Sequence, residues 1–241
     1  MTGLWKVGTV TAVKPQTRTA RSLEIQVPGW PGNLAGQHLD LRLTAADGYT
    51  ATRSYSIASA GSGELVQLAV DKLPDGEVSP YLVDEVIVGD KIELRGPLGG
   101  WFVWRPEQTE PVQLIAGGSG VVPLVAMIRA HEAAGSSAQF RMLYSVREPG
   151  DVFFADELRA LDESSLNLEI DWVYTRKTPD GWRRPAGRVN RAILVESTIP
   201  AGDKPTVFVC GPTGFVEAVA DLLVDMGHPS DRVKTERFGG A

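Results

Sequence analysis

The sequence predicts two halves, an antiparallel β-barrel followed by a doubly wound parallel α/β domain. Three observations support this order. Up to about Trp104, short strand-like segments alternate with turns; a polar, proline-bounded linker then runs from Arg105 to Pro111; beyond it, apolar strands alternate with helical segments. Regularly spaced short strands favour a closed barrel, and alternating strands and helices favour a parallel sheet covered on both faces. We therefore expect domains over residues 1–106 and 111–241.

In the first half, His38–Leu43 alternates polar and apolar residues, as a half-buried antiparallel strand should. Similar strand candidates are Val7–Val13, Leu23–Val27, Leu65–Val70 and Lys91–Leu94. Turns are expected between them at Pro28-Gly29, Pro31-Gly32, Asp47-Gly48 and Gly96-Pro97. One short helix is predicted from Ser79 to Glu85, with Ser79 as its N-cap and Pro80 at the first helical position.

In the second half, strands and helices alternate along the chain. Strands are predicted at Val112–Ala116, Phe140–Tyr144, Leu168–Tyr174 and Thr206–Cys210. Helices are predicted at Val122–Ala134, Val152–Leu161, Asn190–Val195 and Phe215–Met226. Ligands of such sheets bind beyond the carboxyl ends of the strands, where Gly117–Gly120 and Cys210-Gly211-Pro212 both fall.

The composition is that of an ordinary globular protein. With 43% hydrophobic and 22% charged residues in 241, there is no disorder signature, and the longest apolar runs are too short to cross a bilayer. The net charge of -6 argues against general nucleic-acid binding. The N-terminal segment lacks a basic region followed by an apolar core, so we expect a cytoplasmic protein with no membrane partner.

Cysteine and histidine usage predicts no metal site. The single cysteine, Cys210, can neither form an internal disulfide nor supply the thiolates of an iron–sulfur cluster. His38, His131 and His228 are far apart and show no zinc or catalytic spacing. Any iron–sulfur centre must therefore lie on a partner.

The segment Arg53-Ser54-Tyr55-Ser56, expected at the start of a strand, combines three kinds of cofactor contact. An arginine offers a planar fork for a pyrophosphate, a tyrosine a flat face for a ring system, and a serine a donor for a ring nitrogen. Strand alternation places Arg53 and Tyr55 on one face and Ser54 and Ser56 on the other. A plain strand with a surface arginine and a packed tyrosine remains an alternative.

Three glycine-containing segments are candidate backbone contacts. Gly76-Glu77-Val78-Ser79 opens the short helix, where free amides suit a phosphate, although taken alone the segment fits a simple capped helix somewhat better. Gly96–Gly100 is most simply a turn leaving the barrel. Gly117-Gly118-Ser119-Gly120 joins a strand to a helix; it is neither the GxGxxG fingerprint nor a Walker loop, but its glycines permit close approach of a pyrophosphate.

The order of these motifs resembles the ferredoxin–NADP reductase family of flavoenzymes over nearly the whole chain. The matching motifs are RxYS at Arg53–Ser56, GxxS at Gly76–Ser79, GGSGxxP at Gly117–Pro123, CGP at Cys210–Pro212 and an acidic-aromatic tail at Glu236 and Phe238. In that family a small antiparallel barrel holds FAD and the following α/β domain holds the nicotinamide cofactor.

The resemblance implies roles for residues of the first half. Arg53 would bind the FAD pyrophosphate, Tyr55 would pack on the isoalloxazine, and Ser56 would hydrogen-bond near flavin N5. Gly76, Glu77, Val78 and Ser79 would hold the phosphates. Ser54 and Val70 complete the expected flavin contacts.

For the second half, the resemblance implies that Gly117, Gly118, Ser119 and Gly120 face the nicotinamide pyrophosphate. Cys210, Gly211 and Pro212 would lie near the reacting nicotinamide carbon, with Cys210 as a positioning residue. Glu236 would lie by the flavin as a candidate proton relay, so Ser56, Cys210 and Glu236 form the candidate catalytic set. Phe238 stands where some relatives end in a stacking tyrosine, although Gly239, Gly240 and Ala241 follow it here.

The choice of nicotinamide depends on residues that follow the second and third strands of this half. Arg176 resembles the arginine that holds the extra phosphate in NADP-dependent relatives, and Arg147 could assist it. No acidic residue stands at Ser145 or Val146 to take the free ribose hydroxyls of NADH. We expect the protein to prefer NADPH to NADH. The alternative is that the two arginines are simply solvated at the surface and bind no phosphate.

The expected activity is that of an FAD-dependent NAD(P)H oxidoreductase. Electrons would pass to a separate acceptor, which could be a ferredoxin, a haem or metal enzyme, or a small dye-like substrate. A flavin-holding subunit without turnover, a reductase that releases free reduced flavin, and FMN in place of FAD remain alternatives. A candidate docking site for an acidic partner is a basic patch. It is composed of Arg18, Arg21, Arg183, Arg184 and Arg188.

Overall fold

The computed structural model describes residues 4–238. By their contacts these residues form two compact units, one extending to Arg105 and including Val125–Ala130, the other comprising Pro106–Leu124 and the chain from His131 onward. Each unit is described by itself below.

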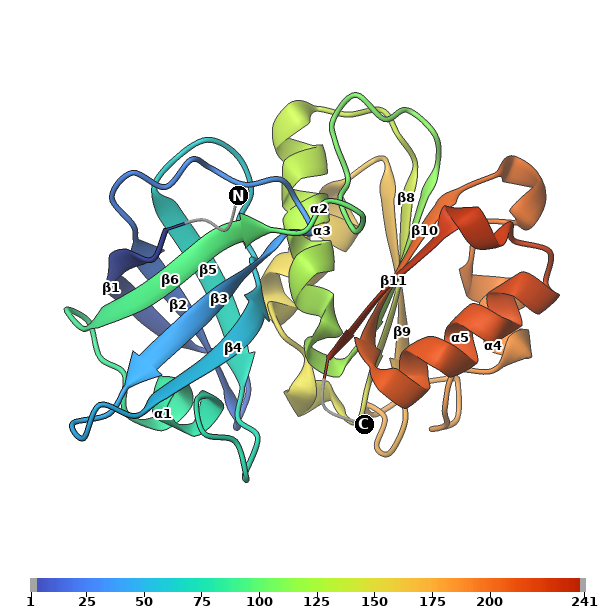
Figure 1. The fold of residues 1–241 in the computed structure, drawn as a ribbon. Coiled ribbons are helices and arrows are strands. Elements are labelled where there is room, and N and C mark those ends of the chain that lie inside the picture. The colour runs from blue at the N-terminus through green and yellow to red at the C-terminus, as the bar shows by residue number, and fades with distance from the viewer. Residues whose placement is uncertain (1–3, 239–241) are drawn as a thin grey trace. The chain divides into compact units, whose positions relative to one another are not determined.

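The first unit is built on a six-stranded antiparallel sheet (Figure 1). Its strands are β1 (Lys6–Pro15), β2 (Ala20–Gln26), β3 (His38–Thr44), β4 (Thr50–Ser56), β5 (Leu65–Asp71) and β6 (Lys91–Leu98), in the order β4-β3-β6-β1-β2-β5. The two outer strands meet where Ile57 bridges Leu68 and the Ala58 N–H donates to the Gln67 carbonyl at 2.7 Å. This contact closes the sheet into a barrel.

The barrel interior is filled by the apolar face of its strands. Leu23 and Ile25 of β2 and Leu39 and Leu41 of β3 are fully buried in one cluster. Leu82 of the short helix α1 (Ser79–Asp84) joins the same cluster. Apolar residues two apart on a strand point to the same side, so each strand contributes a row of side chains to this core.

The second unit is a five-stranded parallel sheet (Figure 1). Its strands are β7 (Val112–Gly117), β8 (Phe140–Val146), β9 (Leu168–Tyr174), β10 (Thr206–Pro212) and β11 (Val233–Phe238), in the order β11-β10-β7-β8-β9. Helices α2 (Val121–Ala134) and α3 (Ala155–Ser164) cover one face, and α4 (Arg191–Ser197) and α5 (Thr213–Asp225) cover the other. The expected doubly wound arrangement is confirmed.

Three local expectations in the first unit are wrong. Arg53–Ser56 ends β4 instead of starting a strand. Val78, not Ser79, is the N-cap of α1, and the Ser79 hydroxyl instead accepts a hydrogen bond from the Leu73 N–H at 3.0 Å. The turn expected at Gly96-Pro97 is absent because β6 continues to Leu98.

Of the strands that the structure describes in the second unit, only β11 was not predicted. Its sequence, VKTERF, is mostly polar, and β11 lies at the edge of the sheet and is only partly buried.

None of the helices within residues 4–238 is both long enough and apolar enough to span a membrane.

Candidate functional site

Arg53 lies on the exposed surface of β4 and meets Glu77 from the segment before α1. The Arg53 Nη1 donates to the Thr52 carbonyl at 2.8 Å, and Nη2 forms an ion pair with Glu77. The Tyr49 hydroxyl donates to the same carboxylate at 2.8 Å. The hydrogen bonds from Tyr49 and then Arg53 lower the pKa of Glu77. The structure therefore joins two residues predicted to contact one cofactor into an ion pair.

The other residues of the Arg53–Ser56 segment differ in how far burial and existing hydrogen bonds leave their side chains available to a ligand. Tyr55 is half-buried against the barrel core, and this burial raises its pKa to about 12. The Ser54 hydroxyl donates to Asp40 at 2.7 Å. Ser56 is half-buried, and no residue among those described hydrogen-bonds its hydroxyl. The Ser56 hydroxyl is thus available to donate a hydrogen bond to a ligand, whereas the Ser54 hydroxyl already donates to Asp40.

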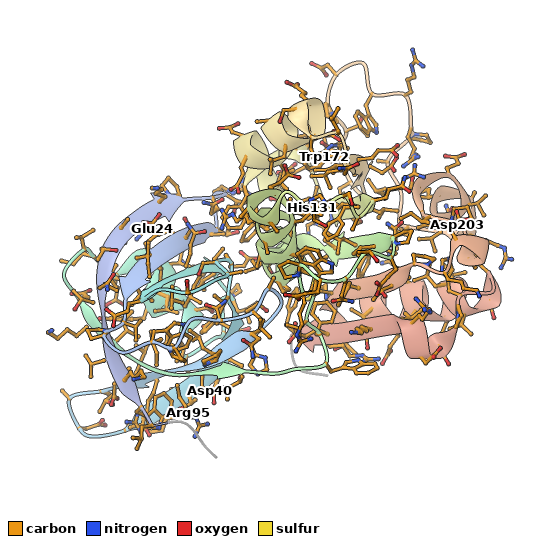
Figure 2. The ribbon with its side chains drawn as sticks, turned by 90° about the horizontal axis from the view of Figure 1, so that it is seen from above. Glu24, Asp40, Arg95, His131, Trp172 and Asp203 are labelled. Carbon is orange, nitrogen blue, oxygen red and sulfur yellow. The ribbon has the colours of Figure 1, made fainter. Side chains whose placement is uncertain are left out.

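Asp40 is a buried carboxylate that the sequence did not lead us to expect. It lies next to Arg95 (Figure 2), whose Nη2 donates to Asp40 Oδ2 at 2.6 Å. Burial alone would raise the pKa of Asp40, but the hydrogen bonds from Arg95 and Ser54 outweigh it and the pKa is lowered. The alternation of His38–Leu43 gave no sign of this pair, because the arginine comes from β6, far along the chain.

Two further predicted cofactor contacts belong to the core. The Val70 and Val78 side chains are each 1% exposed. In the Gly76–Ser79 segment, the Gly76 N–H donates to the Leu73 carbonyl, and Glu77 carries the exposed side chain. The backbone N–H groups of Glu77 and Val78 have no acceptor among residues 4–238. The Ser79 N–H has no acceptor among these residues either, so any backbone phosphate contact here would come from the amides of Glu77, Val78 and Ser79.

The glycine loop follows β7 as a short 3-10 turn, Gly118–Gly120, and leads into α2. A side chain at Gly120 would overlap the backbone of Cys210 and Gly211, and one at Gly117 would lie 2.7 Å from the Phe215 ring. Gly118 has φ +55° with open space around it. Packing thus requires Gly117 and Gly120, while Gly118 and the half-buried Ser119 remain for a ligand.

The end of β10 lies beside this loop, as predicted. Cys210 is paired with Ala116 in the sheet, and the Phe215 ring packs against both Gly117 and Gly211. Cys210 is 1% exposed, and burial followed by the nearby charge of Glu236 raises its pKa well above the usual thiol value. Pro212, at the end of β10, is exposed. A buried neutral thiol fits a positioning role better than a nucleophilic one.

Strand β11 brings the predicted tail residues beside the CGP motif. Glu236 is paired with Cys210 and Phe238 with Pro212 in the parallel register. Burial raises the pKa of Glu236 to about 7. Phe238 is 37% exposed. The three residues after it lie outside the part of the chain that the structure describes.

Ser145, Arg147 and Arg176 lie together at the carboxyl ends of β8 and β9. The Arg176 N–H donates to the Arg147 carbonyl at 2.9 Å, so the two backbones adjoin. Ser145 is buried, whereas both arginines are exposed and no residue among 4–238 pairs with either guanidinium. Both cations are therefore available to an anion.

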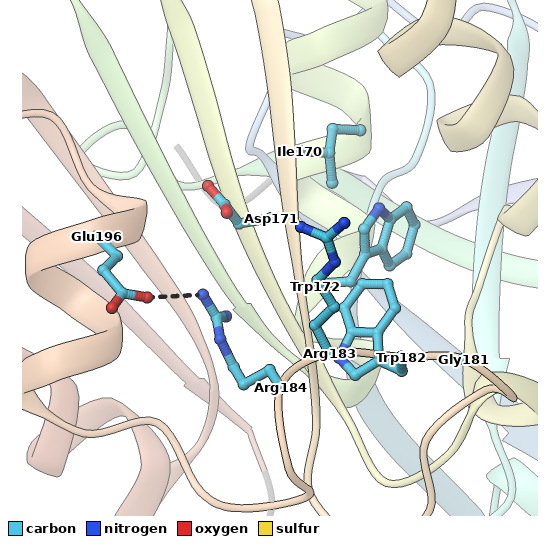
Figure 3. A pocket seen from close by; sticks show the side chains of 8 residues that line it. All are labelled: Ile170, Asp171, Trp172, Gly181, Trp182, Arg183, Arg184 and Glu196. Carbon is cyan, nitrogen blue, oxygen red and sulfur yellow. Dashed lines mark hydrogen bonds and ion pairs between the residues drawn. The ribbon is translucent and has the colours of Figure 1, made fainter.

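A cavity of about 680 Å³ opens at the edge strand β9 (Figure 3). Its lining residues come from β9, the following loop and α4, and they are Ile170, Asp171, Trp172, Gly181, Trp182, Arg183, Arg184 and Glu196. The Arg184 Nη2 binds Glu196 at 3.1 Å, and Trp182 packs edge-to-face on Tyr174. Arg184 thus forms an ion pair within its own unit. Only the run Gly181–Arg184, aromatic and basic, could have indicated this cavity in the sequence.

Two domain families match the chain, in the order that its two units follow. Residues 10–103 match the oxidoreductase FAD-binding domain, and residues 114–221 match the oxidoreductase NAD-binding domain. The chain therefore contains an FAD-binding and an NAD-binding domain.

Individual relatives are similar over nearly the whole chain. The reductase component of propane 2-monooxygenase from Mycolicibacterium smegmatis is 30% identical over 237 residues, covering 95% of this chain and 66% of that protein. The ferredoxin–NAD(P)+ reductase component of naphthalene 1,2-dioxygenase/salicylate 5-hydroxylase systems from Ralstonia sp is 28% identical over 231 residues, covering 96% and 68%. The chain spans 62–66% of three propane 2-monooxygenase reductase components, so these relatives are longer than it is.

A solved structure covers the whole chain. The flavohaem-like FAD/NAD-binding domain of nitric oxide dioxygenase from Vibrio cholerae superposes with a TM-score of 0.87 at 25% identity, covering 100% of both chains. The two matched domains, their order and this superposition agree with the ordered motifs of the sequence. The chain belongs to the ferredoxin–NADP reductase-like family of FAD- and NAD(P)-binding oxidoreductases.

Proposed function

We propose that the protein is an FAD-dependent NAD(P)H oxidoreductase that delivers electrons to a separate redox acceptor. The observation that carries this proposal is the presence of an FAD-binding and an NAD-binding domain on one chain, each with its expected motif. The similarity to reductase components of oxygenase systems supports the direction of electron flow, from nicotinamide through flavin to a partner.

The bound cofactors supply the redox chemistry, which is hydride transfer from the nicotinamide to flavin N5 and release of electrons to an acceptor. The chain's residues supply binding and orientation. Arg53 binds the flavin pyrophosphate through its planar fork, with the Glu77 and Val78 amides as further donors. Tyr55 supports the flavin ring, and the unengaged Ser56 hydroxyl hydrogen-bonds it.

In the second unit, Gly118 and Ser119 would hold the nicotinamide pyrophosphate, and the buried neutral thiol of Cys210 would help to position the nicotinamide. Glu236 holds a proton on its carboxyl group and can release it near neutral pH, because burial raises its pKa to about 7. These residues position and protonate, so no nucleophile is required of the chain.

We infer that NADPH is preferred, because the exposed, unpaired Arg147 and Arg176 adjoin at the ends of β8 and β9. Arg176→Ala should raise KM for NADPH about tenfold and leave KM for NADH within about twofold, since a charged phosphate contact contributes roughly 1.5–3 kcal/mol. Steady-state kinetics with both donors measures this. Arg188→Ala, at an exposed arginine of the same loop, is the control. Equal losses with both donors would show that Arg176 does not bind the phosphate.

The acceptor that we propose is a ferredoxin or the metal-containing component of an oxygenase. The named functions of the monooxygenase and dioxygenase reductase relatives support this class. A subunit that holds flavin without turnover and a reductase that releases free flavin are the competing functions. Both are separated from the proposed one by the following experiment.

The test is the visible spectrum of the purified protein, followed anaerobically as NADPH or NADH is added. Flavin bands that bleach, with the flavin retained on gel filtration, are expected. Bands that persist with both donors would indicate a flavin-holding subunit, and flavin lost during filtration would indicate a flavin reductase. Acid release and chromatography of the flavin distinguish FAD from FMN.

A further inference from the structure

The ion pair between Arg53 and Glu77 places an anion on the guanidinium that is proposed to bind the flavin pyrophosphate. Both side chains are accessible, 51% exposed for Arg53 and 48% for Glu77. Tyr49, which immediately precedes β4, holds the carboxylate from its other side with a hydrogen bond of 2.8 Å. Three residues from two separate segments of the barrel thus form one connected group.

Each of the two terminal nitrogens of the Arg53 guanidinium donates one hydrogen bond within the protein. Nη1 donates to the Thr52 carbonyl, and Nη2 is taken by Glu77. A carboxylate and a phosphate accept from a guanidinium with the same geometry, so both compete for the same donors. Glu77 is ionised at neutral pH, as a glutamate ordinarily is, and the hydrogen bonds from Tyr49 and Arg53 lower its pKa further.

We propose that Glu77 competes internally with the FAD pyrophosphate for Arg53, so that flavin binding requires the Arg53–Glu77 pair to separate. This inference rests on the proposed function, in which Arg53 is the phosphate ligand. Glu77 then lowers flavin affinity in the resting protein, and in the absence of flavin it holds Arg53 against β4.

The size of the effect follows from the exposure of the pair. Exposed ion pairs are weak, so the pyrophosphate can displace Glu77. Glu77→Gln keeps the size of the side chain and removes its charge. We expect this change to lower the Kd of FAD about two- to fivefold, the range that corresponds to an exposed pair.

The experiment is titration of flavin-free protein with FAD and separately with riboflavin, which has no phosphate, using quenching of flavin fluorescence. The variants are Glu77→Gln, Arg53→Ala and the double substitution, and a thermal melt checks that each is folded. Glu85→Gln is the matched control, because it removes an equal charge at the opposite end of α1.

Tighter binding of FAD to Glu77→Gln, unchanged riboflavin binding, and loss of the gain when Arg53 is also replaced would support the competition. Unchanged or weaker FAD binding would overturn it. So would a gain that persists without Arg53, that appears equally with riboflavin, or that Glu85→Gln reproduces, because each indicates a general charge effect. Wild-type protein that binds no flavin, or Arg53→Ala that binds FAD as tightly as wild type, would instead refute the proposed function.

Discussion

The carboxyl group of Glu236 changes its charge near neutral pH. Glu236 lies opposite the buried Cys210 in the register of β10 and β11, and burial raises the pKa of its carboxyl group to about 7 from an ordinary value of 4.5. The folded chain therefore holds this proton more tightly than the unfolded chain does. Its contribution to stability is fully present below pH 4.5 and is lost as the pH rises through 7.

We expect Glu236→Gln to become more stable relative to wild type as the pH rises from 4.5 to 7, because glutamine cannot ionise. The free energy of unfolding of Glu236→Gln should rise by about 2–3 kcal/mol relative to wild type. This is less than the full pKa shift implies, because the carboxyl group is only partly buried. Urea unfolding across this pH range measures it. Glu217→Gln, at an exposed position of α5, is the control and should track wild type. Parallel curves for wild type and Glu236→Gln would contradict the raised pKa.

At the scale of elements, the junction of β7, α2 and β10 depends on glycines more for packing than for ligand access. Gly120→Ala should destabilise the second unit by about 2–4 kcal/mol, because the new methyl group would overlap the backbone of Cys210 and Gly211. Gly214→Ala is the matched control: it lies in the first turn of α5 with open space, and should be neutral or slightly stabilising. Thermal unfolding compares them, and equal melting temperatures would mean that the junction can shift apart.

The same elements show which parts of the fold and of the candidate site can be predicted from the sequence. The central strand β7, predicted at Val112–Ala116 and observed at Val112–Gly117, was found because a strand covered on both faces is largely apolar. Strand β11 was missed because an edge strand carries polar residues, and its position depends on pairing with β10, which no local pattern encodes. The Ser79 cap was wrong because Leu73, six residues earlier, takes the hydroxyl. The cofactor motifs were located by their order, but the Arg53–Glu77 and Asp40–Arg95 pairs depend on tertiary contacts.

At the scale of the whole molecule, the net charge of -6 sets the long-range field that an electron acceptor meets. If the proposed activity is correct, raising the salt concentration from roughly 20 to 200 mM should speed reduction of the anion ferricyanide and slow reduction of a cationic acceptor such as cytochrome c. We expect changes of about two- to fivefold in kcat/KM, measured with NADPH saturating. Ferricyanide reduction that slows with salt would show that a local group of arginines, and not the net charge, controls the encounter.

The way the barrel closes has a consequence for its dynamics. Strand β4 pairs along its length with β3, but its other edge meets β5 only near Ile57 and Ala58. About half of the amides of such a strand point away from its one full partner, so they should be among the first in the barrel to exchange with deuterium. Arg53, Tyr55 and Ser56, three of the residues proposed to hold the flavin, are on this strand, where separating it from β5 breaks few hydrogen bonds. Slower exchange in β4 on adding flavin would therefore report binding directly, without any measurement of turnover.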